Sequence, residues 1–265
     1  HNAAEIILSD FSGSRRTRPL MNKRLPIRIH PQPDDLSCGP TCLHAIYAFY
    51  GEDIALDRVL NEVKRLDDGG TLAVFLACHA LGRGYRAKIF THNLQMFDPT
   101  WFGEKSVNLA DRLRRQEVFR QDPKVTAATG GYLEFLERGG EISFRPFSAD
   151  LLKRYLNRSV PILAGLSATY LYETAREYGP TGEYDDIRGE PVGHFVVLSG
   201  YDRRRRQILV ADPLYPNPLS DNLNYTVGMT RLIHSILLGI VTYDANLLIV
   251  SPAPEAPGSK RSPEC

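Results

Sequence analysis

A cysteine at the start of an apolar segment is the residue of this sequence with the clearest chemical potential. Cys38 lies in QPDDLSCGPTCLHAIYAFYG (residues 32–51), where apolar residues at helical spacing predict a helix buried nearly all round. Pro40 suits a first helical turn, which places Cys38 at the helix N-terminus. Because a helix N-terminus favours negative charge, this position favours a thiolate nucleophile. The alternative is a small buried hydrophobic residue, since free cysteine is among the most buried residue types.

A nucleophilic cysteine needs a base, and the base needs a group that orients it. His194 begins the predicted strand HFVVLSGY, and Asp212 ends QILVAD, with the polar turn DRRRR between them. If these strands form a hairpin, the midpoint of the two residues is residue 203, inside that turn. We therefore expect the side chains to lie opposite or nearly opposite, so that Asp212 fixes the His194 tautomer and stabilises imidazolium. The alternatives are a structural His–Asp pair or an aspartate that caps a turn with Pro213.

A glutamine on a proline-interrupted segment could supply a fourth part. Gln32 lies six residues before Cys38. A side-chain amide and the Cys38 backbone N–H could together stabilise the oxyanion that forms when a thiolate attacks a carbonyl group. The alternative is that Gln32 is a solvated loop residue.

The elements that must position these residues are predicted as helices first and strands later. The helix that begins near Cys38 is followed by further amphipathic helices, whereas the strands with His194 and Asp212 and a final strand NLLIV lie in the second half. This order is typical of the α+β class. The predicted parts are a flexible N-terminal arm (1–25), one domain (26–250) with an insertion near 92–147, and a disordered tail (251–265).

The composition argues against several classes of partner. With 32 Lys and Arg against 31 Asp and Glu, the formal net charge of +1 gives no overall field for nucleic acid or an acidic membrane. No run approaches the roughly 20 apolar residues of a membrane span. The four irregularly spaced cysteines favour reduced thiols and a cytoplasmic location. The expected partner is a peptide or protein substrate.

Two further cysteine–histidine pairs raise the question of a metal. Cys42 and His44 follow Cys38 closely, but a zinc site needs about four ligands and no second pair has suitable spacing. Cys42 is therefore predicted to pack in the core. Cys78 and His79 adjoin each other on a predicted helix and should point in different directions, which makes Cys78 a predicted core residue. Neither a metal nor another cofactor is predicted.

Two polar stretches could form binding surfaces. The run RRRR (203–206) is predicted to be a solvated hairpin tip and not a phosphate or nucleic-acid site. The stretch 167–193 is long for a connection, and such loops are often functional. Its tyrosines could line a peptide cleft or anchor the loop to its own domain: Tyr170, Tyr172, Tyr178 and Tyr184.

The order of these residues resembles that of papain-like cysteine peptidases. Within that group, QPDDLSCGPTCLHAIYAFYG, GGTLAVFLACHALG, VPILAGL, GHFVVLSGYD and ILVADP resemble the thirty-ninth family of cysteine peptidases, which processes bacteriocin precursors after a double glycine. The resemblance spans about residues 32–250. It implies a bacterial protein with a papain-like α+β fold, in which the cysteine helix packs on an antiparallel sheet. By position it implies the roles of nucleophile for Cys38, general base and acid for His194, orienter for Asp212 and oxyanion donor for Gln32.

This sequence departs from the family pattern in one respect that affects the expected substrate. Leader-processing members are usually fused to a transporter with membrane spans and an ATPase, and this sequence carries neither, so double-glycine specificity is not implied. We expect a soluble cysteine peptidase that hydrolyses a peptide or isopeptide bond through an acyl-enzyme. Two alternatives stay open. One is an acyltransferase with the same triad, because an amine resolves an acyl thioester as readily as water does. The other is a catalytically silent peptide-binding module.

Overall fold

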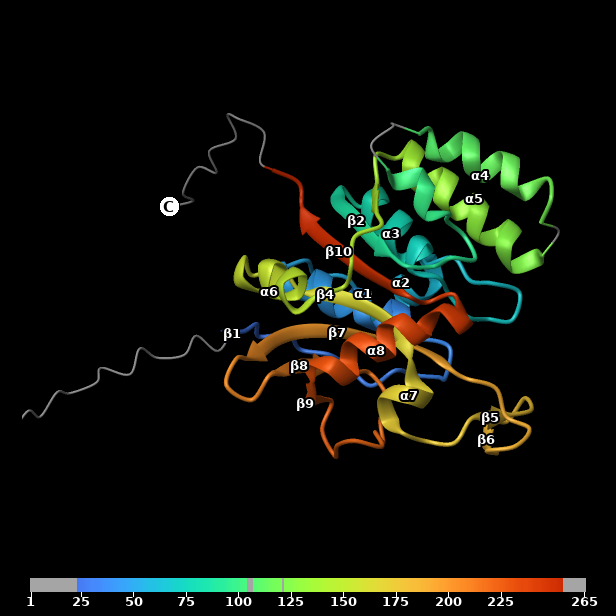
Figure 1. The fold of residues 1–265 in the computed structure, drawn as a ribbon. Coiled ribbons are helices and arrows are strands. Elements are labelled where there is room, and N and C mark those ends of the chain that lie inside the picture. The colour runs from blue at the N-terminus through green and yellow to red at the C-terminus, as the bar shows by residue number, and fades with distance from the viewer. Residues whose placement is uncertain (1–22, 104–106, 121, 255–265) are drawn as a thin grey trace, which may run out of the picture.

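The computed structural model describes residues 23–103, 107–120 and 122–254 (Figure 1). In chain order its elements are β1 (Lys23–Arg24), α1 (Cys38–Phe49), α2 (Leu56–Glu62), α3 (Ala73–Gly82), β2 (Tyr85–Thr91), η1 (Pro99–Phe102), α4 (Leu109–Glu117), α5 (Pro123–Glu137), β3 (Glu141–Ser143), α6 (Ala149–Asn157), β4 (Ile162–Ser167), α7 (Ala168–Tyr172), β5 (Glu177–Tyr178), β6 (Glu183–Tyr184), β7 (Gly193–Asp202), β8 (Gln207–Ala211), β9 (Asn224–Gly228), α8 (Met229–Leu238), η2 (Gly239–Thr242) and β10 (Asn246–Pro252). The helices α1 to α3 precede the long strands, as predicted.

A sheet in the order β3-β2-β10-β4-β7-β8-β9 forms the frame, and β1 pairs with β7 beside this path. Neighbouring strands are antiparallel except β2 and β3, which are parallel. In the view of Figure 1, α1 runs behind the strands and α8 in front of them. The α+β class is confirmed, and the expected antiparallel pairing holds for the strands that carry the candidate site. The parallel edge strand β3 is the one departure, which makes the sheet mixed.

Helix α1 is buried from Cys38 to Tyr47, as its nearly continuous apolar sequence predicted. It packs against β7, α2 and α3. Full burial of side chains such as Leu43 and Ile46 contributes roughly 1.5–3 kcal/mol each. The approach is closest at Gly39, where an added Cβ would lie 2.7 Å from Thr71 Cγ2. Glycine therefore lets the helix start seat tightly against its neighbours.

The predicted arm and tail lie mostly outside the described residues, which exclude 1–22 and 255–265. The arm was predicted to end at residue 25, yet Lys23–Arg24 pair with Tyr201 and Gly200 of β7. The adjoining Leu25 is buried, and its N–H donates to the Ser199 carbonyl. These contacts join the chain to the sheet from Lys23 onward. In the same way β10 continues through Pro252, beyond the expected start of the tail.

The region 92–147, predicted as an insertion, forms η1, α4, α5 and β3. Figure 1 shows α4 and α5 side by side at one end of the molecule. Helix α5 packs on α3, and its Phe135 is fully buried. Both helices begin at capped positions, where the side chains of Asn108 and Asp122 accept N–H bonds from the first turn.

Candidate active site

The predicted hairpin is formed by β7 and β8, and its turn at 203–206 is exposed. A β-bulge between Leu198 and Gly200 shifts the strand register by one residue, so that Val197 lies opposite Ala211. A one-residue change of register moves side chains to the other face of the sheet. The bulge therefore decides which residues of β7 share a face with the end of β8.

Continued by one residue, this register sets Asp212 opposite Val196. His194 and Val196 point to the same face because side chains alternate along a strand. The histidine thus reaches the aspartate diagonally, and its Nε2 lies 2.8 Å from Asp212 Oδ1. The structure brings the predicted pair together. The two residues are not directly opposite, because the pairing beyond the bulge is centred on residue 204 and not on residue 203.

Asp212 is fully buried and accepts a set of hydrogen bonds that hold it in place. Its Oδ2 accepts from Tyr172 Oη at 2.8 Å and Tyr225 Oη at 2.7 Å, and Asn217 Nδ2 lies 3.0 Å away. The backbone N–H of Leu214 donates to Oδ1 at 3.0 Å. Burial acts to raise the pKa of the carboxyl, but the charge of His194 and these hydrogen bonds hold it below its ordinary value. Asp212 is therefore a buried carboxylate.

His194 is buried and interacts with both Asp212 and Cys38. Burial acts to lower the pKa of its imidazole, but the negative charges of Asp212 and Cys38, with hydrogen bonds to both side chains, raise it to about 10. At neutral pH this environment favours imidazolium. A positive imidazolium between a carboxylate and a sulfur stabilises a thiolate.

Cys38 is the first residue of α1 and its side chain is buried, with 8% of its surface exposed. The predicted position at the helix start is therefore found. Ser37 precedes it without a side-chain cap, because its Oγ donates to Asp34 Oδ1 at 2.7 Å. Within the described chain no carbonyl or side chain accepts the Cys38 backbone N–H. This N–H is available for a bound oxyanion.

Gln32 lies beside both halves of the site. Its backbone N–H donates to the Pro213 carbonyl at 2.8 Å, which joins it to the chain just after Asp212. Its Nε2 donates to the Asp34 carbonyl at 3.0 Å, in the turn before α1. One amide hydrogen is thus engaged and the second remains, while Oε1 is buried without a partner among the described residues. No hydrogen bond links its side chain to Cys38 in the part of the chain described.

The sequence did not identify the residues that hold Asp212. The sequence marks Tyr172 as one of the loop tyrosines but does not predict this role, and it predicts no contact of Tyr225 or Asn217 with Asp212. Alternation in the strand NYTVG marks Tyr225 as inward-facing, although only the pairing of β9 with β8 sets it near Asp212. The other tyrosines of the 167–193 stretch differ, since Tyr170 and Tyr184 are exposed.

Cys42 packs in the core as expected, and its Sγ donates to the Phe195 carbonyl at 3.2 Å. This bond ties α1 to the residue after His194. His44 is engaged elsewhere, with Nε2 3.0 Å from the Ile54 carbonyl oxygen. Over the three described ranges, no group of three or more His, Cys, Asp or Glu side chains could hold a metal ion.

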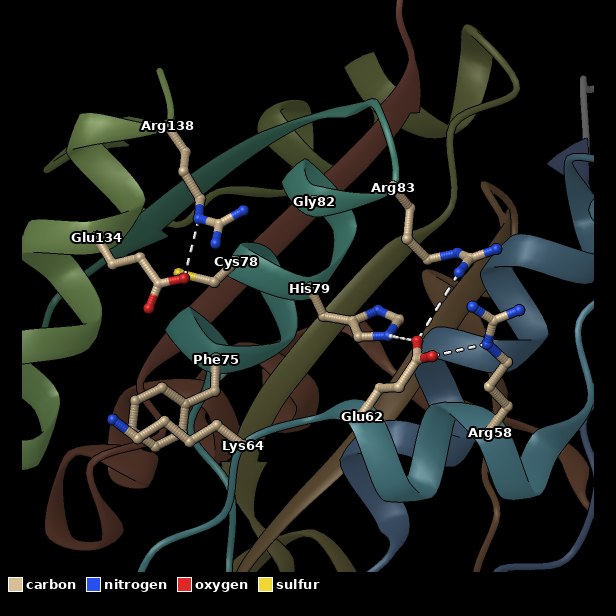
Figure 2. Close-up of a pocket in the computed structure, with 10 residues that line it drawn as sticks. All are labelled: Arg58, Glu62, Lys64, Phe75, Cys78, His79, Gly82, Arg83, Glu134 and Arg138. Carbon is tan, nitrogen blue, oxygen red and sulfur yellow. Dashed lines mark hydrogen bonds and ion pairs between the residues drawn. The ribbon is translucent and has the colours of Figure 1, made fainter.

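Cys78 and His79 line a separate pocket of about 370 Å³. Figure 2 shows the two side chains pointing away from each other, as predicted, with His79 turned toward Glu62. Both ring nitrogens of His79 are engaged, Nδ1 with Tyr47 Oη at 2.8 Å and Nε2 with Glu62 Oε2 at 3.1 Å. Burial raises the pKa of the Cys78 thiol to about 12. This pocket therefore lacks a nucleophile with a paired base.

None of the described helices has the length and apolar character needed to cross a membrane.

Comparison with known proteins gives a family match over most of the chain. The model of the Peptidase C39-like family matches residues 24–233. A C39-like peptidase described from Bacillus anthracis is 14% identical, with 89% of this chain and 100% of that chain covered and a TM-score of 0.47. A double-glycine-motif protease from an AMS/PCAT transporter, solved with the leader peptide, is 14% identical, with coverage of 88% and 99% and a TM-score of 0.41. Xylellain, a cysteine protease from Xylella fastidiosa, is 14% identical, with coverage of 88% and 86% and a TM-score of 0.44. No curated protein sequence matches the chain.

Proposed function

The chain belongs to the Peptidase C39-like family, and we propose that it is a cysteine peptidase that hydrolyses a peptide or isopeptide bond. The observation that carries this proposal is the buried His194–Asp212 pair beside a cysteine at the N-terminus of α1. A structural His–Asp pair would have no need of a thiol as its third member. The proposed nucleophile is Cys38, and the proposed substrate is a peptide or protein.

In the first step the Cys38 thiolate attacks the substrate carbonyl carbon, and the carbonyl electron pair moves to oxygen. The Cys38 N–H and the second amide hydrogen of Gln32 are the proposed donors to this oxyanion. The His194 imidazolium then transfers its proton to the leaving nitrogen as the C–N bond breaks. An acyl thioester remains on Cys38, and His194 is neutral.

In the second step neutral His194 accepts a proton from water, whose oxygen attacks the thioester carbonyl. The C–S bond breaks, the acid is released, and the thiolate–imidazolium pair is restored. Asp212 keeps its charge throughout because its hydrogen bonds and His194 hold its pKa low. It acts through His194, whose ring orientation it fixes.

A peptide library tests the proposal directly. Wild-type protein incubated with proteome-derived peptides is expected to create new termini, read by mass spectrometry, that Cys38→Ala does not create. Cys78→Ala is the matched control, because it removes another buried thiol that lies in the separate pocket. The proposal fails if Cys38→Ala and wild type give the same termini.

The same experiment separates the two alternative functions. Hydrolysis in H₂¹⁸O adds ¹⁸O to the new carboxyl end. An acyltransferase would instead join the acyl group to an added amine such as glycine amide. A silent binding module would retain peptides without cleaving them in either variant.

A further inference from the structure

A cleft of about 270 Å³ opens beside the candidate nucleophile. It is lined by Cys38 at the start of α1, by Thr71 from the loop before α3, and by Gly193 at the start of β7. Asp244, between η2 and β10, forms part of the same lining. Any group seated in this cleft lies close to the reacting sulfur.

Asp244 is built into the cleft wall. The residue is 6% exposed, and its Oδ1 is buried without a hydrogen-bond partner in the part of the chain described. Two glycines make room for it. A Cβ at Gly193 would collide with Asp244 Oδ2, and a Cβ at Gly165 would lie 2.6 Å from the Asp244 carbonyl oxygen. The fold therefore makes room for the Asp244 carboxyl but does not give its Oδ1 a hydrogen-bond donor among the described residues.

An unsatisfied buried carboxyl destabilises a fold, so its presence in a cleft points to an external partner. Burial raises the pKa of Asp244 to about 8, while Lys124, Thr242 and His194 act in the opposite direction. A cation seated in the cleft against the Asp244 carboxyl group would supply both a hydrogen bond and the opposite charge.

The charges around the cleft favour the same kind of partner. Asp35 and Asp68 line it together with Asp244, and Lys124 is its one lining cation among the described residues. Lys124 is partly committed, since its Nζ lies 3.7 Å from Asp68 Oδ2. No ion pair to Asp35 or Asp244 is formed by the residues described. The wall therefore carries more negative than positive groups.

We propose that Asp244 is a specificity-determining residue that binds a cationic group of the substrate, an ammonium or guanidinium, next to the scissile bond. This inference rests on the proposed peptidase function, which makes Cys38 the reacting residue. The cation can come from a Lys or Arg side chain or from a free α-amine. In either case the substrate presents a positive charge within one or two residues of the bond that Cys38 attacks.

Binding to the Cys38→Ala variant tests this without requiring turnover. Calorimetry compares acetylated tetrapeptide amides with lysine or norleucine at each position of an Ala–Gly background. At one position, lysine is expected to bind at least about tenfold more tightly than norleucine. In Cys38→Ala/Asp244→Asn this ratio should fall to within about twofold. Asp57→Asn is the matched control, because it removes an exposed acid of α2 outside the cleft.

A separate comparison tests the second possible source of the positive charge, a free α-amine. If the α-amine is the ligand, non-acetylated peptides should bind at least about tenfold more tightly than their acetylated forms, and the position of lysine should have no effect. Equal binding of lysine, norleucine, acetylated and free peptides would overturn the inference.

Proton release gives a readout that does not depend on a variant at residue 244. Because its raised pKa keeps the Asp244 carboxyl protonated near pH 7, binding of a cation should release this proton. The measured heat of binding should then vary with the ionisation enthalpy of the buffer. The other groups near Asp244 are Lys124 and Tyr132 on α5 and His194 on β7. Their contribution is measured with the strongest-binding norleucine peptide, which should release no proton.

The outcomes separate this inference from the proposed function. Cleavage of lysine, norleucine, acetylated and free-amine peptides at equal rates by wild type would support the peptidase and overturn the role of Asp244. Charge-selective binding to Cys38→Ala, with no cleavage of the same peptides by wild type, would support the cation site and contradict the peptidase.

Discussion

Replacing Asp212 by asparagine should remove the charge that holds His194 as imidazolium. The difference between the ordinary pKa of 6.5 and the raised value of about 10 corresponds to about 5 kcal/mol, at about 1.4 kcal/mol for each step of one in pKa. Asp212 and Cys38 share this stabilisation. If Asp212 supplies about half, its loss weakens the ion pair by roughly 2–3 kcal/mol. We therefore expect kcat/KM to fall on the order of 100-fold at pH 7.

Two measurements check this result on folded Asp212→Asn. His194, followed by NMR against pH, should lose its ring proton at a clearly lower pH in the variant than in wild type, where Asp212 and Cys38 raise its pKa. The rate of cleavage of a peptide found with the library should fall as above. Asp202→Asn is the matched control, since Asp202 lies at the turn of the same hairpin and bonds Arg204 N–H. An unchanged His194 titration, with kcat/KM within about threefold of wild type, would show that Asp212 does not hold the charge of His194.

Three further predictions concern the helix start, the oxyanion donor and the cleft carboxyl. Gly39→Ala should destabilise the protein by roughly 1–3 kcal/mol in urea unfolding, because the new Cβ overpacks against Thr71; an unchanged midpoint would contradict the close seating of α1. Gln32→Ala should lower kcat about 10²–10³-fold with Cys38 alkylation unchanged, and an equal loss of both would assign Gln32 a structural role. Asp244 has a pKa of about 8 in the folded protein against an ordinary 3.8, so the folded state binds the extra proton between these values and stability falls as pH rises through that window. Asp244→Asn removes this loss of stability. In urea unfolding, the free energy of unfolding of Asp244→Asn relative to wild type should therefore be about 4 kcal/mol more favourable at pH 8 than at pH 5. A difference between variant and wild type that does not change with pH would contradict the buried, unpaired carboxyl.

The parts of the site that the sequence predicted depend on local patterns. Cys38 was placed at a helix start because a continuous apolar run and a proline mark that end of α1. His194 and Asp212 were brought together because the two strands around a charged turn are consecutive, so their pairing follows from chain symmetry. Each inference needed only neighbouring residues and the regular geometry of helices and hairpins.

The parts that were missed depend on long-range order. The one local signal for the bulge near Ser199 is Gly200, since a glycine within a strand often marks a bulge. The sequence does not show that this bulge shifts the register so that His194 meets Asp212 diagonally. Tyr225 contacts Asp212 only because β9 pairs with β8 in one register. Asp244 reaches the cleft because β10 lies between β2 and β4, an order that sequence position does not reveal.

The rate of Cys38 alkylation by iodoacetamide, measured against pH, shows whether His194 holds Cys38 as a thiolate. Mass spectrometry separates this thiol from Cys42 and Cys78, whose pKa values burial raises, so both should react slowly below pH 8. A Cys265→Ser background removes the remaining cysteine. We expect fast alkylation of Cys38 that persists at about pH 6 and is lost in His194→Ala. Slow alkylation that rises only with hydroxide, and equally in both proteins, would contradict it.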